Sequence, residues 1–315
     1  MKKLYVIRKK KIKYSLIINM IYNYILLILI IILVVLTIFY IFHIYNSLIY
    51  DDIDNHIYYM NKDETAMFLE YDEDKYVYNL SNIDLYARKV LSNEEYIYNI
   101  KNSAASFTNN DKDVLNKCIE RADELLRCVK IDNIIKEPNL RYSKNINFND
   151  LANIKWVLSL TSNENSDNNL IKEYEEGLPH TRANVIFLSN KVLNYLEDEL
   201  IKILIHEKIH IYQRNNEELF KIIVNDMGYV EVSNITEISY NTIKHIRSNP
   251  DVNRKIYKNP NTGKLMICLY NNDKPNGIND VDLVDYSLEH PYEKIAYEIS
   301  EYIHNMNKIE KYKNI

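Results

Sequence analysis

The sequence predicts an α+β fold that follows an N-terminal transmembrane helix and a helical stalk. First, residues 14–50 contain no Lys, Arg, Asp or Glu, which is typical of a membrane span. Second, residues 111–129 place apolar side chains at helical spacing, with charged side chains on the opposite side. Third, a short apolar run at 185–188 precedes a long helical pattern, so we expect a strand beside a helix in the C-terminal part.

Length and composition limit the classes of protein that remain. The 315 residues are 47% hydrophobic and 26% charged, enough for one large domain or two modest ones with a buried core. The four glycines cannot supply GxGxxG or GxxxxGKS/T, which excludes the usual dinucleotide and P-loop fingerprints. The formal net charge of −5 argues against nucleic acid as a partner.

Residues 24–44 form the predicted transmembrane helix, because about 20 apolar residues cross a hydrocarbon core of about 30 Å. The apolar run is longer than that of a signal peptide, and no small-residue cleavage site follows it. The tail at 1–23 carries seven Lys and Arg residues and no acid, whereas Asp51, Asp52 and Asp54 follow the span. The positive-inside rule therefore predicts a single-pass protein with a cytosolic N-terminus, a lipid bilayer as partner, and a lumenal or external main body.

Two further segments follow the predicted span. Residues 45–110 are polar and rich in Tyr, Asn and Asp, with weak periodicity, so we interpret them as a stalk with short helices. Residues 111–315 are predicted to form one folded domain. Its expected elements are a helix at 111–129, a loop at 162–169, a strand at 181–189, a helix at 191–214, a hairpin of 255–257 with 264–270, and a helix from Pro291 to about 308.

The pattern His-Glu-x-x-His at 206–210 indicates the chemistry of that domain. Two histidines at i and i+4 share one face of a helix, so His206 and His210 can bind one zinc ion. Glu207 lies beside the first histidine, where it can act as general base on a zinc-activated water. The residues before the pattern are apolar almost all round, which predicts a buried helix, and burying such polar groups without a partner is costly.

A catalytic zinc site requires a third protein ligand. The HExxHxxGxxH extension is absent, because Gln213 and Asn216 occupy its glycine and third-histidine positions. The preferred ligand is Glu293, in the sequence Glu-Lys-Ile-Ala-Tyr on the last helix, where the small Ala296 allows a close helix approach. The alternative ligands are Glu298, Glu231 and Glu237.

The Glu293 segment is similar to the E-x-x-A/S-D helix that supplies the third ligand in gluzincin metallopeptidases. In that family the aspartate braces a ligand histidine. Here Tyr297 stands in its place, so the resemblance leaves the brace to the Tyr297 hydroxyl or to another residue. The distance along the chain from the histidines to Glu293 is also long for a gluzincin.

A wider resemblance covers roughly residues 111–303. The chain resembles an uncharacterised zincin-like family of giant and other large DNA viruses, with the HExxH and EKIAYE segments as its specific part. The resemblance implies a zincin-like metallopeptidase fold for 111–315 and a viral source, so that the membrane would be a host endomembrane or the virion membrane. The strings that carry it are LNKCIERAD, IKWVL, YEEGLPHTR, VIFLS, LIHEKIHIYQR, RSNPD and HPYEKIAYEIS.

The segment before the zinc helix offers candidate substrate contacts. In zincins an edge strand above the metal pairs with an extended peptide, so the strand at 181–189 is expected to bind substrate through its main chain. His180 and Arg182 could contact substrate or stabilise an oxyanion, or could be a turn residue and a surface charge. Farther along, Arg247 and Asp251 flank a turn and are expected to form an ion pair.

Together these patterns predict a membrane-anchored zinc metallopeptidase that acts on a peptide or protein. Zn²⁺ would be held by His206, His210 and Glu293, with Glu207 as general base. The first alternative is a non-catalytic viral membrane or virion protein with a structural or decayed zinc site. The second is a zinc-dependent hydrolase of a non-peptide amide.

Overall fold

The computed structural model describes residues 26–27, 32–33, 56–162, 174–285 and 288–313. The chain divides into two units, 1–55 and 56–315, and the four described residues of the first unit are helical. Among the described residues, no helix has the length and apolar character that a bilayer crossing requires. The predicted span at 24–44 and tail at 1–23 otherwise lie outside the described residues, as does most of the predicted loop at 162–169.

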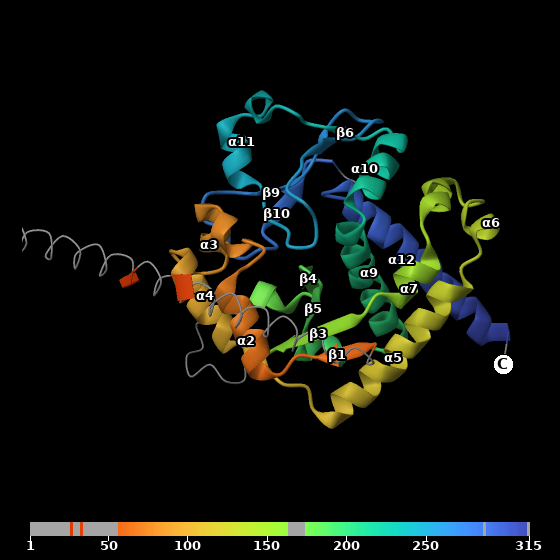
Figure 1. Ribbon diagram of the computed structural model, residues 1–315. Coiled ribbons are helices and arrows are strands. Elements are labelled where there is room, and N and C mark those ends of the chain that lie inside the picture. The colour runs from red at the N-terminus through yellow and green to blue at the C-terminus, as the bar shows by residue number, and fades with distance from the viewer. Residues whose placement is uncertain (1–25, 28–31, 34–55, 163–173, 286–287, 314–315) are drawn as a thin grey trace, which may run out of the picture. The chain divides into compact units, whose positions relative to one another are not determined.

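A mixed sheet forms the centre of the second unit (Figure 1). Its strand order is β1-β3-β5-β4, in which β1, β3 and β5 are parallel and β4 is antiparallel to β5. β2 pairs antiparallel with the far end of β3. The strands are β1 (Ile57–Tyr59), β2 (Ala104–Ala105), β3 (Trp156–Thr161), β4 (His180–Arg182) and β5 (Val185–Ser189).

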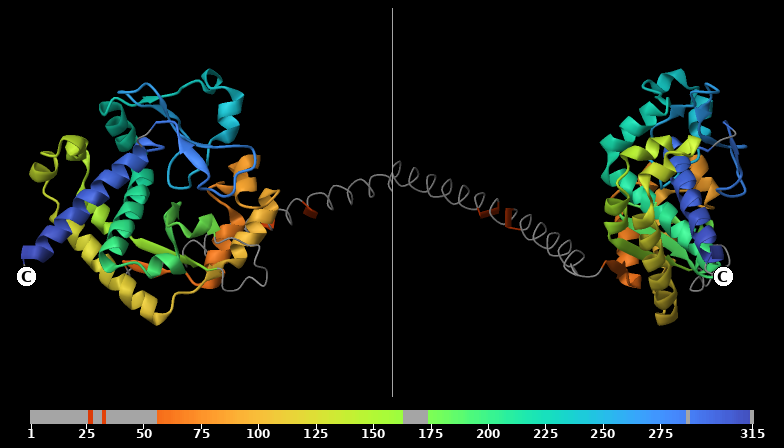
Figure 2. Two further views of the ribbon diagram at one scale, coloured as in Figure 1. Left: turned by 180° about the vertical axis from the view of Figure 1, so that it is seen from behind. Right: turned by 90° about the vertical axis from the view of Figure 1, so that its right-hand side faces the viewer.

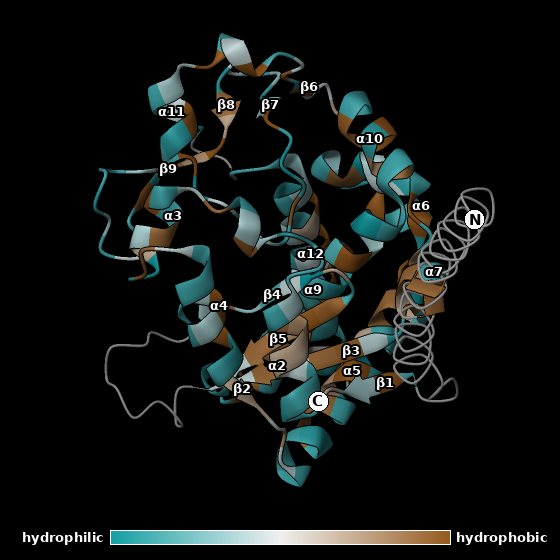
Figure 3. Cartoon of the chain, turned by 60° about the vertical axis from the view of Figure 1, so that its left-hand side comes forward, coloured by the Kyte–Doolittle hydropathy of each residue, from teal (hydrophilic) through white to brown (hydrophobic). Residues whose placement is uncertain are grey.

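Helices cover both faces of this sheet, so its strands are apolar on both sides. Val185 and Phe187 of β5 pack on the side of α2 (Lys62–Tyr71) and α4 (Asn93–Asn102). Ile186 and Leu188 point to the opposite side and join the larger core. That core includes α5 (Asn109–Cys128), α7 (Phe148–Asn153), α9 (Glu197–Asn215) and α12 (Pro291–Lys313). Figure 3 shows β3 and β5 as the hydrophobic layer between these helices.

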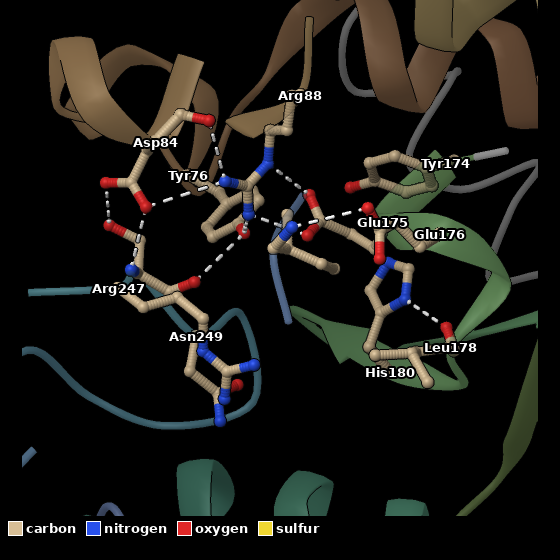
Figure 4. A network of polar contacts seen from close by, with 12 residues as sticks. Tyr76, Asp84, Arg88, Tyr174, Glu175, Glu176, Leu178, His180, Arg247 and Asn249 are labelled. Atoms are coloured by element: carbon tan, nitrogen blue, oxygen red, sulfur yellow. Dashed lines mark hydrogen bonds and ion pairs between the residues drawn. The ribbon is translucent and has the colours of Figure 1, made fainter. Parts of the chain in front are cut away.

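The prediction of a stalk at 45–110 is wrong for residues 56–110, which belong to the compact unit. They supply β1, β2, α2, α4, the short helix η1 (Val77–Asn79) and α3 (Asn82–Ala87). The polar composition is compatible with a folded segment because three of its charged side chains, Asp72, Asp84 and Arg88, are buried in ion pairs. Arg88, at the end of α3, donates to both carboxylate oxygens of Glu175, at 3.0 and 2.7 Å (Figure 4). Burial of this kind is tolerated only when the charge is paired and hydrogen-bonded.

The predicted strand at 181–189 is two strands joined by a tight turn, so that prediction is wrong in its extent. β4 and β5 pair directly from Arg182 to Val185, and Ala183 in the turn has φ 48°. Alanine rarely adopts this left-handed conformation, so residue 183 does not indicate a turn. A glycine or an asparagine at this position would have indicated one. The hairpin leaves β4 at the edge of the sheet.

The predicted helix at 191–214 is also interrupted. α8 (Asn190–Leu193) ends before Leu196, which is extended at φ −61° and ψ 145°, and α9 begins at Glu197. Three consecutive acidic residues, 197–199, fill the first turn of α9, where they favour the positive end of the helix dipole. The helix predicted at 111–129 is confirmed as α5, which a capping box between Thr108 and Asp111 begins.

α9 and α12 pack against each other along much of their length (Figures 1 and 2). The helix predicted from Pro291 is confirmed as α12, although it extends to Lys313. Ile295, Ala296, Ile299 and Ile303 of α12 are fully buried in the core that α9 shares. This packing brings the first turn of α12 beside the middle of α9.

The segment between α9 and α12 forms a smaller group of short elements around two further sheets. β7 and β8 are antiparallel, which confirms the predicted hairpin. Its second arm is shorter than the predicted 264–270, because residues 268–270 form β9, which pairs with β10. The elements are α10 (Glu217–Asp226), β6 (Val230–Glu231), η4 (Ile235–Glu237), α11 (Tyr240–His245), β7 (Tyr257–Lys258), β8 (Leu265–Met266), β9 (Cys268–Tyr270) and β10 (Val281–Leu283). Three more short helices lie elsewhere in the unit: α6 (Ile131–Ile134), η2 (Pro138–Asn145) and η3 (Tyr174–Gly177).

Candidate metal centre

Three side chains from α9 and α12 form a compact group of ligand atoms. The Nε2 atoms of His206 and His210 lie 3.1 Å apart. Glu293 Oε2 lies 3.4 Å from His206 Nε2 and 3.5 Å from His210 Nε2. In tetrahedral coordination, bonds to zinc of about 2.0–2.1 Å separate two ligand atoms by about 3.3 Å. The triangle therefore has the dimensions that a single zinc ion requires, and two imidazoles with one carboxylate are a ligand set that zinc accepts.

Gln213 fixes the orientation of one histidine ring. Its Oε1 accepts a hydrogen bond of 2.9 Å from His210 Nδ1, and its Nε2 donates to the Tyr292 carbonyl at 3.0 Å. Since that carbonyl only accepts, the amide orientation is determined, and His210 must carry its proton on Nδ1. The Nε2 lone pair then faces His206 and Glu293, as a ligand nitrogen should.

Two possibilities were open for the brace, the Tyr297 hydroxyl or another residue, and at His210 it is another residue, Gln213. The Tyr297 side chain is 48% exposed, and Lys202 lies over its ring. α12 turns this position outward, whereas Gln213 lies one turn after His210 on the same face of α9. Gln213 occupies the position of the glycine in the HExxHxxGxxH pattern.

The alternative third ligands lie in other ion pairs. Glu298 accepts from Tyr142 at 3.1 Å and from Lys294 at 2.6 Å. Glu231 pairs with Lys255, and Glu237 pairs with Lys258. Of the four glutamates considered, Glu293 alone joins the two histidines in the described part of the chain.

Glu207 is buried on the same helix as the histidines. Its side chain is near Asp251 and Glu293, and its Oε2 atom has no hydrogen-bond partner among the described residues. Burial, followed by the negative charges of Asp251 and Glu293, raises the pKa of Glu207 well above its usual range. A partner-free oxygen beside the ligand triangle is suited to accept a proton from a water molecule.

The charges of the ligand group favour a cation. Burial would raise the pKa of Glu293, but His210 and His206 outweigh it and hold that pKa well below its ordinary value. Burial lowers the pKa of His210, and Glu293 more than compensates and raises it. The carboxylate is therefore ionised against two imidazoles, where a divalent cation can replace the shared protons.

The edge of β4 is closed by side chains. Asp251 Oδ1 accepts the Thr181 N–H at 2.5 Å, and Arg214 Nη2 donates to the Thr181 carbonyl at 3.0 Å. Arg214 also donates to the Ala183 carbonyl at 3.0 Å. These are the main-chain groups that an added strand would pair with, so an extended peptide must displace Asp251 and Arg214 before it can pair with β4.

The predicted substrate contact at His180 is not supported. His180 Nδ1 donates to the Leu178 carbonyl at 2.9 Å (Figure 4). The ring also stacks on Phe187, with the ring centres 5.2 Å apart. Its Nε2 atom lacks a partner among the described residues and faces a cavity of about 70 Å³. Burial lowers the pKa of His180, so the buried ring is neutral. His180 is therefore not a charged surface residue.

The predicted substrate contact at Arg182 is also not supported, because this side chain is a buried structural cation. It is fully buried, pairs with Asp72 and Asp74, which follow α2, and donates to the Tyr174 hydroxyl at 3.1 Å.

The predicted ion pair of Arg247 with Asp251 is wrong. Arg247 instead pairs with Glu289 at 2.5 Å, while Asp251 binds β4.

No protein-family model matches the chain, and searches among curated proteins and among solved structures find no similar protein. The class of the site is therefore defined by its own geometry, a His-His-Glu triangle with an adjacent buried glutamate.

Proposed function

We propose that residues 56–315 form a zincin-like, zinc-dependent hydrolase of peptide bonds that an N-terminal helix anchors in a membrane. His206, His210 and Glu293 would hold Zn²⁺, which supplies a Lewis acid and lowers the pKa of a coordinated water. The observation that carries the proposal is the triangle of 3.1, 3.4 and 3.5 Å, beside which Glu207 has one oxygen, Oε2, without a hydrogen-bond partner among the described residues.

The proposed roles follow from the surroundings of each residue. Glu207 accepts a proton from water and later delivers it to the leaving amine. Its burial and the nearby negative charges raise its pKa, which favours the protonated form between the two transfers. Gln213 keeps the His210 ring in the ligating tautomer. A mixed sheet with an antiparallel edge strand beside the HExxH helix also supports a zincin-like fold.

The closed edge of β4 favours the second candidate, a hydrolase of a small non-peptide amide. Such a substrate could reach the partly exposed His206, whose side chain is 22% exposed, without pairing with Thr181. A peptide library and a set of small acyl amides, each assayed with and without chelator, separate the two. Cleavage of the amides alone would favour this candidate.

The ligand assignment predicts that Glu293→Ala loses most of its zinc. Removing one of three ligands should weaken zinc binding by more than about 100-fold. That is more than the usual effect of removing a residue that only hydrogen-bonds to a ligand. Zinc per chain after dialysis is measured by elemental analysis. Glu298→Ala, on the same helix, is the matched control and should keep its zinc. If Glu293→Ala keeps its zinc, the assignment of Glu293 is wrong.

The proposed topology predicts that microsomes protect residues 51–315 from added protease, while the basic tail is digested. A bilayer excludes protease from the lumenal side, and the tail would face the cytosol. Antibodies against each end report the two fragments, and detergent provides the control, since it should expose the body. Digestion of the body in sealed microsomes would reverse the proposed orientation.

A further inference from the structure

The turn Asn249-Pro250-Asp251 lies directly against the proposed metal centre. Asn249 Oδ1 accepts the Asp251 N–H at 2.8 Å, and Asn249 Nδ2 donates to Glu293 Oε1 at 2.8 Å. The same Nδ2 donates to Glu289 Oε1 at 2.8 Å. Ionised carboxylates only accept and a main-chain N–H only donates, so these three contacts allow a single orientation of the amide.

This contact makes the two oxygens of Glu293 unequal. Oε2 faces the histidines, whereas Oε1 is occupied by the amide of Asn249. A carboxylate with one oxygen engaged in this way binds a cation through the other. One-oxygen binding gives three protein ligands and leaves a fourth position for water, as a catalytic zinc site requires.

The turn is held firmly enough to impose this arrangement. Proline at 250 keeps Asn249 out of the helical region. At one end Glu289, which orients Asn249, is itself bound by Arg247 at 2.5 Å. At the other end Asp251 is hydrogen-bonded to the Thr181 N–H and hydroxyl, at 2.5 and 2.9 Å. The Arg247 and Glu289 side chains are 16% and 12% exposed, and weak screening by solvent strengthens such contacts.

We propose that Asn249 is a positioning residue of the metal centre, which holds Glu293 as a one-oxygen zinc ligand. This inference rests on the proposed function, because it requires that the triangle bind zinc. A purely structural role would use the Oδ1 contact, which closes the turn, and the Nδ2 contact to Glu289. The donation from Nδ2 to Glu293 is the additional feature, and the two roles can be separated by substitution.

Asn249→Ser keeps the turn, because a serine hydroxyl can accept the Asp251 N–H, but it removes the Nδ2 contacts to Glu293 and Glu289. The Glu293→Gln background described below separates the loss of the two contacts. We expect zinc affinity, measured by competition with a chelator, to fall about 10- to 100-fold. Asn253→Ser is the matched control. Asn253 Oδ1 accepts the Lys255 N–H in the same kind of turn, and Asn253 makes no hydrogen bond to Glu293 among the described residues. Equal zinc affinity in Asn249→Ser and the unaltered chain would overturn the inference.

Zinc X-ray absorption of the unaltered chain provides a test that needs no variant. One-oxygen binding predicts four neighbours around the zinc, and five neighbours, with both Glu293 oxygens bound, would overturn the inference.

In a Glu293→Gln background, Asn249→Ser should cause no further loss of zinc affinity, and an undiminished loss would assign Asn249 a role unrelated to Glu293. If the unaltered chain binds no zinc, the proposed function itself fails. If the chain binds zinc equally well with Asn or Ser at 249, only the role of Asn249 fails.

Discussion

Glu207→Gln is expected to abolish hydrolysis while the protein keeps its zinc. The amide retains the shape of the side chain but cannot accept a proton from water, so the rate should fall by roughly 10²- to 10⁴-fold. Glu207 is absent from the ligand triangle, so one zinc per chain should remain. Turnover is measured with the peptide library at neutral pH, and bound zinc by elemental analysis on the same samples.

The control is Glu197→Gln, an exposed glutamate in the first turn of the same helix, which should leave both turnover and zinc unchanged. Turnover that survives in Glu207→Gln with zinc bound would remove Glu207 from the role of general base. A chain that binds zinc but shows no chelator-sensitive turnover, with either residue at 207, would instead support the non-catalytic alternative.

The ligand triangle could be anticipated from sequence because each part has a local pattern. The histidines are one helical turn apart, and Glu293 follows a proline that begins a helix. Gln213 had a weaker signal, since it is three residues after His210 on the same face. The HExxH pattern itself assigns no role to a glutamine at this position, so its contact with His210 is visible only in the structure.

The contacts of Asn249 with Glu293 and of Asp251 with Thr181 could not be predicted, because these partners are far away in the chain. Glu293 and Thr181 reach this turn only when α9, α12 and β4 have packed together. The same limit explains the error at 56–110. Composition cannot show that Arg88 and Glu175 neutralise each other inside the fold, so a buried polar network resembles an exposed, loosely folded segment.

The largest expected effect on stability is at Asp123, which is hydrogen-bonded to Lys208 of α9. Asp123 Oδ1 accepts from Lys208 Nζ at 2.8 Å, and Oδ2 from His56 Nε2 at 2.6 Å. The side chain of Lys208 is 1% exposed, with its ammonium 3.9 Å from the ring centre of Trp156. Asp123→Ala leaves that ammonium buried without a counter-charge, so the free energy of unfolding should fall by about 3–5 kcal/mol.

Chemical denaturation measures this loss, with Glu120→Ala as the control on the exposed side of the same helix. That control should change the free energy of unfolding by less than about 0.5 kcal/mol. The double variant Asp123→Asn, Lys208→Met removes both charges, so it should lose less stability than Asp123→Ala. A smaller loss in Asp123→Ala than in the double variant would show that the buried charge is not the cause.

The pH dependence of this difference identifies the carboxylate as its source. Burial raises the pKa of Asp123, but the hydrogen bond from His56 and the charge of Lys208 outweigh it and lower that pKa below its usual value. A lowered pKa in the folded state contributes stability above about pH 4, and this contribution is lost as the pH falls through the folded-state pKa. The difference between the unaltered chain and Asp123→Asn should therefore be largest near neutral pH and shrink in acid. A difference that stays constant from neutral pH to below pH 3 would assign the effect to packing, because protonation would then have no part in it.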